Sequence, residues 1–317
     1  MNSDTLLKEL FSDPSLSAIH DCFLFDVLGS GLEANKNKTL RDLNQEHPSW
    51  SVDDMLYGVQ ALVQAEKEDR LERYSLHGGR TSYISLLAKN KTKNDFVLLC
   101  SGGAYGSVCN LVEAFPAAAK CNEAGFDAYI LNYETATKES FSNGLFPQPF
   151  IDLATALSLI QSSRKGDGYY LVGYSAGGHL VSLFSSADFV VHQYHLPSPK
   201  GIILGYPFFT MEMVPEGPVK NYMCAGLFGQ NYSAEDLRKY SVFGHSFLQY
   251  PPTYIVHALD DDTIDPKQVE AFEKSAKASR VPVKVETIET GGHGFGIGRS
   301  LAAAGYIERA LDYFEKP

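Results

Sequence analysis

Apolar runs alternate with amphipathic runs along most of the chain after residue 70. The apolar runs are short and predict buried strands at residues 95–100, 128–133, 168–174, 201–207, 252–258 and 283–289. The amphipathic runs predict helices at 108–124, 150–163, 176–186, 266–279 and 298–315. Repeated strand–helix units of this length predict an α/β fold, in which a mostly parallel central sheet is flanked by helices. Residues 71–76 and 81–88 alternate around Gly78 and Gly79, which predicts a hairpin that opens the sheet.

Two segments depart from this alternation. Residues 1–70 predict a helical extension, with short helices at 39–44 and 52–65, that packs on the α/β domain of residues 71–317 or on a second subunit, as in a homodimer. Residues 207–250 are rich in aromatic and Met side chains. They predict either a cap-like insertion over a pocket or a helical connection whose aromatic side chains fill the core, and the sequence leaves both open. We expect both segments to set substrate access and to contribute no reacting group.

The segment with the clearest chemistry is Gly173-Tyr174-Ser175-Ala176-Gly177. It follows the strand-like run 169–172 and opens a helix-like run, which is the context in which a G-x-S-x-G motif exposes a serine on a sharp turn. Ser175 is the expected nucleophile, and the glycines leave room for a strained backbone and for a helix packed close to its strand. Because such a pentapeptide also occurs on ordinary strand-to-helix turns, the motif needs partners elsewhere in the chain.

A base and an acid follow at later strand ends, in the order expected after such a serine. The run 283–288 leads into Gly291-Gly292-His293-Gly294, and a histidine surrounded by glycines lies on a loop, so His293 is the expected base. The run 252–257 leads into three consecutive aspartates at 260–262. Asp261 is the favoured acid from its place in that loop, and Asp262 is the alternative.

The loop Ser101-Gly102-Gly103-Ala104-Tyr105-Gly106 follows the predicted strand 95–100. Its glycines allow backbone N–H groups to approach a developing oxyanion without a Cβ in the way. A nucleotide-binding turn is the alternative, but the loop carries neither a G-x-G-x-x-G pattern nor a G-K-[ST] ending. We also expect Tyr105, Tyr174 and Phe295 to line the substrate pocket.

These segments, together with Gly125–Tyr133 and Pro251–Thr253, make residues 70–317 resemble the α/β-hydrolase superfamily, and within it the bacterial acetyl-esterase, acetylxylan-esterase and feruloyl-esterase-like branch. The resemblance implies Ser175 as nucleophile, Asp261 as acid and His293 as base. It also implies oxyanion N–H donors from Gly103 or Ala104 and from Ala176. The implied activity is hydrolysis of small-molecule esters with short acyl groups, such as acetyl groups on carbohydrates, through an acyl-enzyme and without a metal or organic cofactor.

The chain departs from that family at three positions: Ser101 replaces Pro or His, Ala104 replaces Gly, and Asp265 replaces Pro. The third departure makes the acid loop less fixed and keeps Asp262 open as the acid. Two other functions also stay open, a serine peptidase or amidase of the same fold and a non-catalytic binding protein on a hydrolase scaffold. A chain of 317 residues leaves no room for the large gating domain of such peptidases, and complete catalytic motifs argue against the scaffold.

Composition narrows the expected partners. A net charge of −11 repels phosphate backbones and anionic lipid surfaces, so nucleic acid and membranes are poor expected partners. Five scattered cysteines without a C-x-x-C pattern argue against a disulfide framework or a zinc site. The start of the chain lacks the pattern of a signal peptide, and no run reaches the ~18 apolar residues of a membrane span. We therefore expect a cytoplasmic protein.

Overall fold

The computed structural model describes residues 1–315, apart from the side chain of Val219. Its centre is an eight-stranded sheet with the order β1-β2-β4-β3-β5-β6-β7-β8. The strands are β1 (Leu71–Ser75), β2 (Ser82–Leu86), β3 (Phe96–Cys100), β4 (Asp127–Asn132), β5 (Tyr169–Tyr174), β6 (Gly201–Gly205), β7 (Thr253–Ala258) and β8 (Val283–Ile288). Strand β2 runs antiparallel to β1 and β4, and the other pairs are parallel. The predicted α/β fold with an opening hairpin is confirmed.

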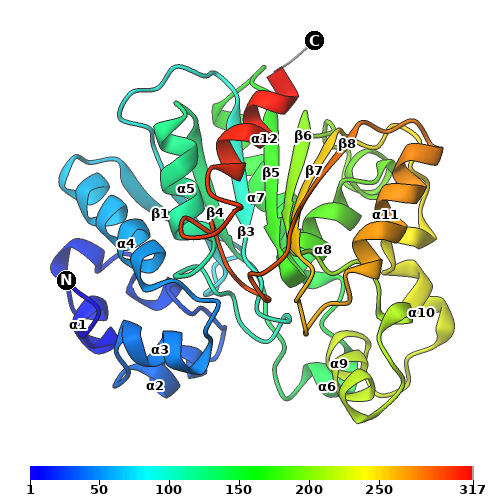
Figure 1. Cartoon of the computed structure of the whole chain (residues 1–317), viewed down its shortest axis with the longest axis horizontal. Coiled ribbons are helices and arrows are strands. Elements are labelled where there is room, and N and C mark those ends of the chain that lie inside the picture. The colour runs from blue at the N-terminus through cyan, green and yellow to red at the C-terminus, as the bar shows by residue number, and fades with distance from the viewer. Residues whose placement is uncertain (316–317) are drawn as a thin grey trace.

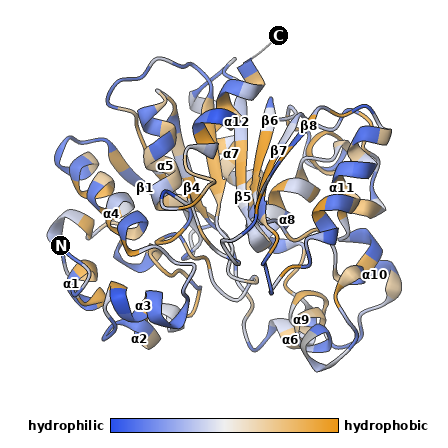
Figure 2. Ribbon diagram, in the orientation of Figure 1, coloured by the Kyte–Doolittle hydropathy of each residue, from blue (hydrophilic) through white to orange (hydrophobic). Residues whose placement is uncertain are grey.

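Helices cover both faces of the sheet (Figure 1). Helices α5 (Ala114–Glu123) and α12 (Tyr306–Glu315) pack on one face, and α7 (Gln148–Ser163), α8 (Ser175–Phe184) and α11 (Lys267–Ala278) pack on the other. Side chains of a strand alternate between the faces: Val97 and Leu99 join the core with α5, whereas Phe96 and Leu98 join the core with α7 and α8. Because both faces are buried, β3 is apolar at every position, and hydrophobic residues, in orange, are frequent in the central strands of Figure 2.

Two helices are shorter than their sequence patterns predict. Helix α5 begins at Ala114 instead of residue 108, because residues 101–113 form a loop whose backbone bonds run to other parts of the chain. Helix α12 begins at Tyr306 instead of residue 298. Gly298 and Gly305 both have positive φ, at 57° and 79°, so the segment between them turns before the helix starts.

The N-terminal extension packs on the α/β domain. It contains α1 (Leu7–Phe11), α2 (Ser30–Asn35), α3 (Leu40–Glu46), α4 (Val52–Lys67) and two 3₁₀ turns, Pro14–Leu16 and His20–Cys22. Ser51 caps α4 by accepting a hydrogen bond from the Asp54 N–H. Gly58 lets α4 approach α5 closely, since a Cβ there would lie 2.7 Å from the Pro116 nitrogen. Met55, Val59 and Leu62 are fully buried in the same core as α5, so the extension and the domain share one apolar core.

Residues 207–250 form short helical segments beside α6 (Ser140–Asn143). They are the 3₁₀ turn Met211–Met213, α9 (Pro218–Phe228), α10 (Ala234–Lys239) and the 3₁₀ turn Val242–Gly244. A π-helical turn, Asp188–Gln193, lies outside this segment, between α8 and β6. The carbonyl of Leu227 accepts hydrogen bonds from the backbone of Leu145 and Phe146, which joins α9 to the segment after α6. Phe209 and Tyr240 are buried in the core under α7 and α8. The insertion thus fills core with its aromatic side chains, which is one of the two predicted roles.

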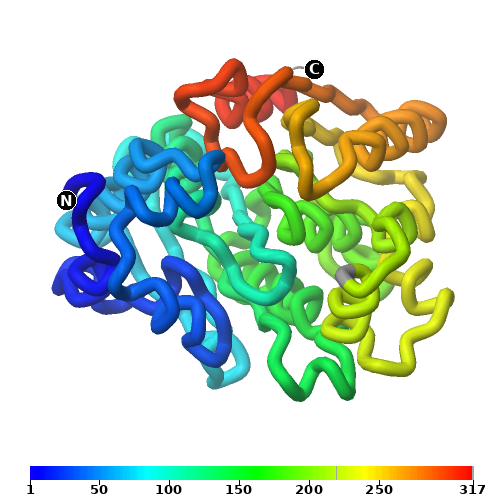
Figure 3. The backbone as a smooth tube through the Cα atoms, turned by 60° about the horizontal axis from the view of Figure 1, so that its bottom comes forward, coloured from blue at the N-terminus to red at the C-terminus, as the bar shows by residue number. Residues whose placement is uncertain are grey.

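The carboxyl ends of the parallel strands meet at one edge of the sheet, which is turned toward the viewer in Figure 3. There the segment near residue 50, in blue, lies beside the loop near residue 295, in orange-red. Within residues 1–315, no helix combines the length and apolar character that crossing a membrane requires.

Candidate active site

Ser175 occupies a sharp turn where β5 ends and α8 begins. Its φ is +50°, a left-handed conformation that is uncommon for a residue with a side chain and that marks local strain. A Cβ on Gly177 would lie 2.1 Å from the Cys100 carbonyl oxygen, and one on Gly173 would lie 2.5 Å from the Gly177 carbonyl oxygen. The two glycines of the motif therefore let the helix start directly against the sheet and hold Ser175 at its edge.

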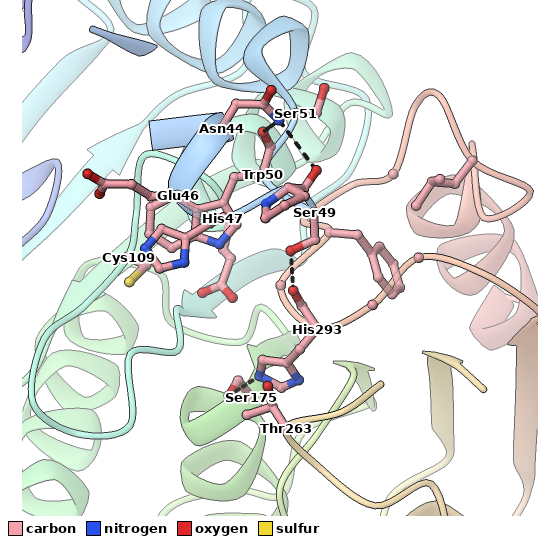
Figure 4. Close-up of a pocket in the computed structure, with 18 of the residues that line it drawn as sticks. Asn44, Glu46, His47, Ser49, Trp50, Ser51, Cys109, Ser175, Thr263 and His293 are labelled. Atoms are coloured by element: carbon pink, nitrogen blue, oxygen red, sulfur yellow. Dashed lines mark hydrogen bonds between the residues drawn. The ribbon is translucent and has the colours of Figure 1, made fainter. Parts of the chain in front are cut away.

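His293 lies between Ser175 and Asp261, and the contact with Ser175 is visible in Figure 4. Its Nε2 is 2.8 Å from Ser175 Oγ, and its Nδ1 is 2.8 Å from Asp261 Oδ2. With the proton on Nδ1, the imidazole donates to the carboxylate and accepts from the serine hydroxyl. This is the geometry in which a histidine removes the proton of a serine nucleophile.

The structure distinguishes the two candidate acids. The Asp261 side chain is buried, and its Oδ1 accepts hydrogen bonds from the Thr263 and Ile264 N–H groups, both at 2.9 Å. Asp262 is exposed and bonds only to the Thr263 hydroxyl among the described residues. The backbone of the loop therefore points Asp261, and not Asp262, at His293.

Asp260 has a separate contact with the loop of the histidine. Its Oδ1 accepts hydrogen bonds from the N–H groups of Gly291 and Gly292, at 2.9 and 2.8 Å. These bonds link the loop after β7 to the loop after β8, so two adjacent aspartates hold His293 by different means.

The loop after β3 provides two N–H groups near Ser175. Gly103 has a φ of 129°, and a Cβ there would lie 2.2 Å from the Ser107 carbonyl oxygen, so only glycine fits. Ala104 has a φ of 52°, in the small left-handed region that a residue with a Cβ can occupy. Within residues 1–315, neither N–H donates to a protein acceptor. The N–H of Ala176 lies in the first turn of α8, where backbone donors have no intrahelical partner.

A pocket of about 1020 Å³ opens at Ser175, and residues 44–53 of the N-terminal extension form one of its walls. Figure 4 shows Trp50 and His47 stacked on this wall, with ring centroids 4.2 Å apart. The Ser49 hydroxyl donates a hydrogen bond to the carbonyl of His293. No sequence pattern indicated this contact, because it joins residues 244 positions apart. The extension therefore contacts the loop of the expected base as well as the pocket.

The pocket lining is acidic and differs in part from the sequence expectation. Its outer part carries exposed carboxyl groups of Glu46, Asp53, Asp260 and Asp262, and none of its described lining residues is Lys or Arg. Phe295 is on the lining as expected. Among residues 207–250, none of those with a described side chain lines it.

Tyr105 and Tyr174 do not line the pocket, which corrects the expectation for both. Tyr105 is 2% exposed, and its hydroxyl lies 2.7 Å from His179 Nδ1 in the core behind α8. Tyr174 is the last residue of β5 and is fully buried, with its hydroxyl 2.7 Å from that of Tyr306 on α12. Both rings point into the core, where the hydroxyl group of each has a hydrogen-bond partner, and not toward Ser175.

Glu113 is a pocket residue that the sequence reasoning missed. It lies inside the predicted helix 108–124, where nothing distinguished it from a surface carboxylate, yet it is only 4% exposed. Burial raises the pKa of its carboxyl to about 7, against the opposing effects of the Gly102 N–H, the Tyr206 hydroxyl and the nearby His293. Nowhere in residues 1–315, the pocket included, do three His, Cys, Asp or Glu side chains gather as a metal site would require.

A family profile described as alpha/beta hydrolase fold matches residues 102–297, which is more than half of the chain. The chain belongs to the α/β-hydrolase family. The matched range contains the loop after β3 from Gly102 onward, together with Ser175, Asp261 and His293. The resemblance found in the sequence motifs is thereby confirmed at the level of the family.

This α/β hydrolase has similar proteins among curated sequences and solved structures. An acetylxylan esterase of Xylanibacter ruminicola is 22% identical over 258 residues, which are 76% of this chain and 50% of that protein; the chain thus spans about half the length of this relative. An acetyl ester-xyloside bifunctional hydrolase of Caldicellulosiruptor lactoaceticus is 22% identical with a TM-score of 0.60, over 74% of this chain and 87% of its own. A carboxylesterase of Lactobacillus plantarum is 18% identical with a TM-score of 0.63, over 77% and 96%. At these identities, the structural likeness shows the shared fold.

Proposed function

We propose that this protein is a serine carboxylic-ester hydrolase. The observation that carries the proposal is the pair of 2.8 Å contacts by which the two ring nitrogens of His293 connect Ser175 Oγ to Asp261 Oδ2. Each group comes from the end of a different strand, so only the folded chain assembles them. The names of the similar proteins, which include an acetylxylan esterase and a carboxylesterase, support ester chemistry over other uses of this fold.

The reaction would proceed in two half-reactions. Ser175 Oγ attacks the ester carbonyl carbon while His293 Nε2 takes the hydroxyl proton, and Asp261 stabilises the imidazolium. The N–H groups of Ala176 and of Gly103 or Ala104 stabilise the tetrahedral oxyanion. The intermediate collapses, the C–O bond to the alcohol breaks, and His293 returns the proton to the departing alkoxide. Water then attacks the acyl-enzyme with His293 as base, and the acid leaves as Ser175 regains its proton.

The pocket favours an uncharged alcohol group. Carboxylates at its outer edge and the lack of Lys or Arg among its described lining residues would repel an anionic leaving group. Asp53, Asp262 and Thr263 offer acceptors for hydroxyl groups, and Trp50 offers an apolar ring face. An acetylated carbohydrate matches these groups, and the names of two similar proteins, an acetylxylan esterase and an acetyl ester-xyloside bifunctional hydrolase, combine acetyl esters with sugars. We therefore propose short-acyl esters of neutral sugars as the substrate class.

A direct test compares wild type with Ser175→Ala on p-nitrophenyl acetate. We expect the variant to lose at least about 10⁴-fold in kcat, since the three groups act as one unit. A fluorophosphonate should label wild type and leave Ser175→Ala unlabelled. The matched control is Ser162→Ala, whose side chain is exposed on α7 and, among the described residues, bonds only to the Leu159 carbonyl. Unchanged turnover in Ser175→Ala would contradict the proposal.

The substrate class has its own test. Release of acetate from acetylated xylo-oligosaccharides should be faster than from the same sugars carrying a uronic acid, and p-nitrophenyl acetate should react faster than the hexanoate. Faster turnover of aminoacyl-naphthylamides than of any ester would instead identify an amidase. Absence of both turnover and labelling in folded protein would favour a binding protein.

A further inference from the structure

Glu113 is a buried carboxyl group beside Ser175 to which the proposed mechanism assigns no role. It lies at the start of α5 and contacts two segments that are far apart in the sequence. Its Oε2 accepts a hydrogen bond from the Gly102 N–H, at the start of the oxyanion loop. Its Oε1 accepts a hydrogen bond of 2.9 Å from the Tyr206 hydroxyl, which follows β6. A buried carboxyl group with two donors is held in a single orientation.

Tyr206 continues this connection to the loop of His293. Its hydroxyl oxygen accepts a hydrogen bond of 3.0 Å from the Gly296 N–H. Its ring contacts the imidazole of His293 edge-on, with centroids 5.0 Å apart. The backbone of Tyr206 has a φ of +36°, outside the conformations that a residue with a large side chain prefers. Strain of this kind persists only where the surroundings hold the residue in place, and it is concentrated at functional sites.

Gly102 is packed tightly between Glu113 and Ser175. A Cβ at Gly102 would lie 2.7 Å from the Ser175 Cβ and 3.4 Å from Glu113 Oε1. Gly102, whose N–H binds Glu113, directly precedes Gly103 and Ala104, which offer the oxyanion donors. A shift of this peptide would move the N–H groups of Gly103 and Ala104 relative to the carbonyl that Ser175 attacks.

The groups around the carboxyl are neutral apart from the base. The titratable groups that the charge of Glu113 affects include Cys109 in the loop before α5, Tyr133 after β4, Tyr174 at the end of β5, Tyr206 after β6 and Tyr306 on α12. Burial raises the pKa of each of these five groups above its usual value, so they stay uncharged. His293 is the neighbour that gains a positive charge during the reaction, and such a charge favours an ionised Glu113.

We propose that Glu113 is a positioning residue that links the oxyanion loop to the loop of the base, through the Gly102 N–H on one side and the Tyr206 hydroxyl on the other. The link holds the donors of Gly103 and Ala104 in register with Ser175 and His293. This inference rests on the proposed function and adds to it a second carboxyl group, which acts without touching the substrate.

Three substitutions separate this role from a contribution to folding. Glu113→Ala removes both acceptors. Glu113→Gln keeps an amide oxygen for the Gly102 N–H, which can only donate, and so keeps the contact with the oxyanion loop. Tyr206→Phe keeps that contact but removes the one with Gly296. Glu123→Ala is the control, because it truncates the same side chain at the exposed end of the same helix.

The experiment measures kcat and KM on p-nitrophenyl acetate together with the second-order rate of fluorophosphonate labelling. We expect Glu113→Ala to lower kcat and the labelling rate about 10- to 100-fold with KM changed less than about threefold, as for donors displaced by a fraction of an ångström. Glu113→Gln should recover most of the loss, Tyr206→Phe should lose about 3- to 10-fold, and Glu123→Ala should match wild type.

Two results would overturn the inference. One is folded Glu113→Ala with kcat and labelling rate within twofold of wild type, and the other is a Gln variant that is as impaired as the Ala variant. If Glu113→Ala does not fold, the result for Tyr206→Phe decides whether the inference stands. A Tyr206→Phe variant with unchanged kcat and labelling rate also overturns the inference. Wild type that is labelled at Ser175 but hydrolyses no ester would contradict the proposed function alone. The labelling rates of the variants would still test whether Glu113 links the oxyanion loop to the loop of His293.

Discussion

Replacement of Asp261 by Asn should leave the fold intact and inactivate the enzyme through the tautomer of His293. In the wild type, Oδ1 of Asp261 accepts from two backbone N–H groups, Thr263 and Ile264, and Oδ2 accepts from His293 Nδ1. The Asn amide has one oxygen and one NH₂ group. Its oxygen must face the two backbone donors, because the reverse orientation would set an NH₂ against them and leave both unpaired, at about 1–3 kcal/mol each.

The Asn NH₂ group then faces His293 Nδ1, which must become an acceptor. The imidazole proton moves to Nε2, 2.8 Å from Ser175 Oγ, so this nitrogen can no longer take the serine proton. We expect kcat on p-nitrophenyl acetate to fall by about 10⁴-fold, which corresponds to about 5 kcal/mol of transition-state stabilisation. The melting temperature should change little, because both backbone bonds of the loop are kept.

Asp262→Asn is the matched control, since Asp262 is exposed and its carboxylate bonds to the Thr263 hydroxyl and not to His293. It should retain activity within about threefold of wild type. Asp261→Asn with more than about a tenth of wild-type kcat, or Asp262→Asn with the larger loss, would contradict this role of Asp261.

Three further outcomes are expected. Ser49→Ala removes the hydrogen bond to the His293 carbonyl and should lower kcat about 2- to 10-fold at nearly unchanged melting temperature, whereas Ser49→Thr should retain activity; equal activity of both variants would show that this bond does not position the base. Gly177→Ala should yield insoluble protein, because its Cβ would lie 2.1 Å from the Cys100 carbonyl oxygen, and a soluble, active variant would contradict that steric reading. Glu113→Gln should be more stable than wild type above pH 7. Burial raises the pKa of Glu113 from 4.5 to about 7 in the folded chain, so between these pH values the folded chain holds a proton that the unfolded chain releases. The free energy of unfolding of wild type should therefore fall by up to about 3 kcal/mol as pH rises from about 4.5 to 7. Thermal unfolding of both proteins across that range measures the gap, and a gap independent of pH would contradict the raised pKa.

The sequence alone predicted the fold, the serine and the histidine of the candidate site, and a cluster of three aspartates as the source of its acid. Apolar runs of five or six residues separated by amphipathic runs admit few arrangements other than a parallel sheet covered on both faces. In such a sheet, the carboxyl ends of neighbouring strands meet at one edge. Residues that follow different strands, such as Ser175, His293 and the aspartates at 260–262, were therefore expected together although 118 positions separate the first two.

Tertiary structure alone decided which aspartate faces the base and which residues complete the pocket. The choice of Asp261 over Asp262 depends on two backbone N–H groups, whose directions no residue pattern encodes. Tyr174 was expected in the pocket, but its ring points into the core toward Tyr306.

The same limit applies to the parts of the site that come from far away in the chain. Ser49 reaches the loop of His293 from the N-terminal extension, and Glu113 joins the oxyanion loop to Tyr206. Local patterns report periodicity and turn chemistry within one element, whereas these contacts arise where separate elements pack against each other. A surface carboxylate and a buried one have the same sequence signature, and only the packing of α5 against the sheet made Glu113 a buried group at the active site.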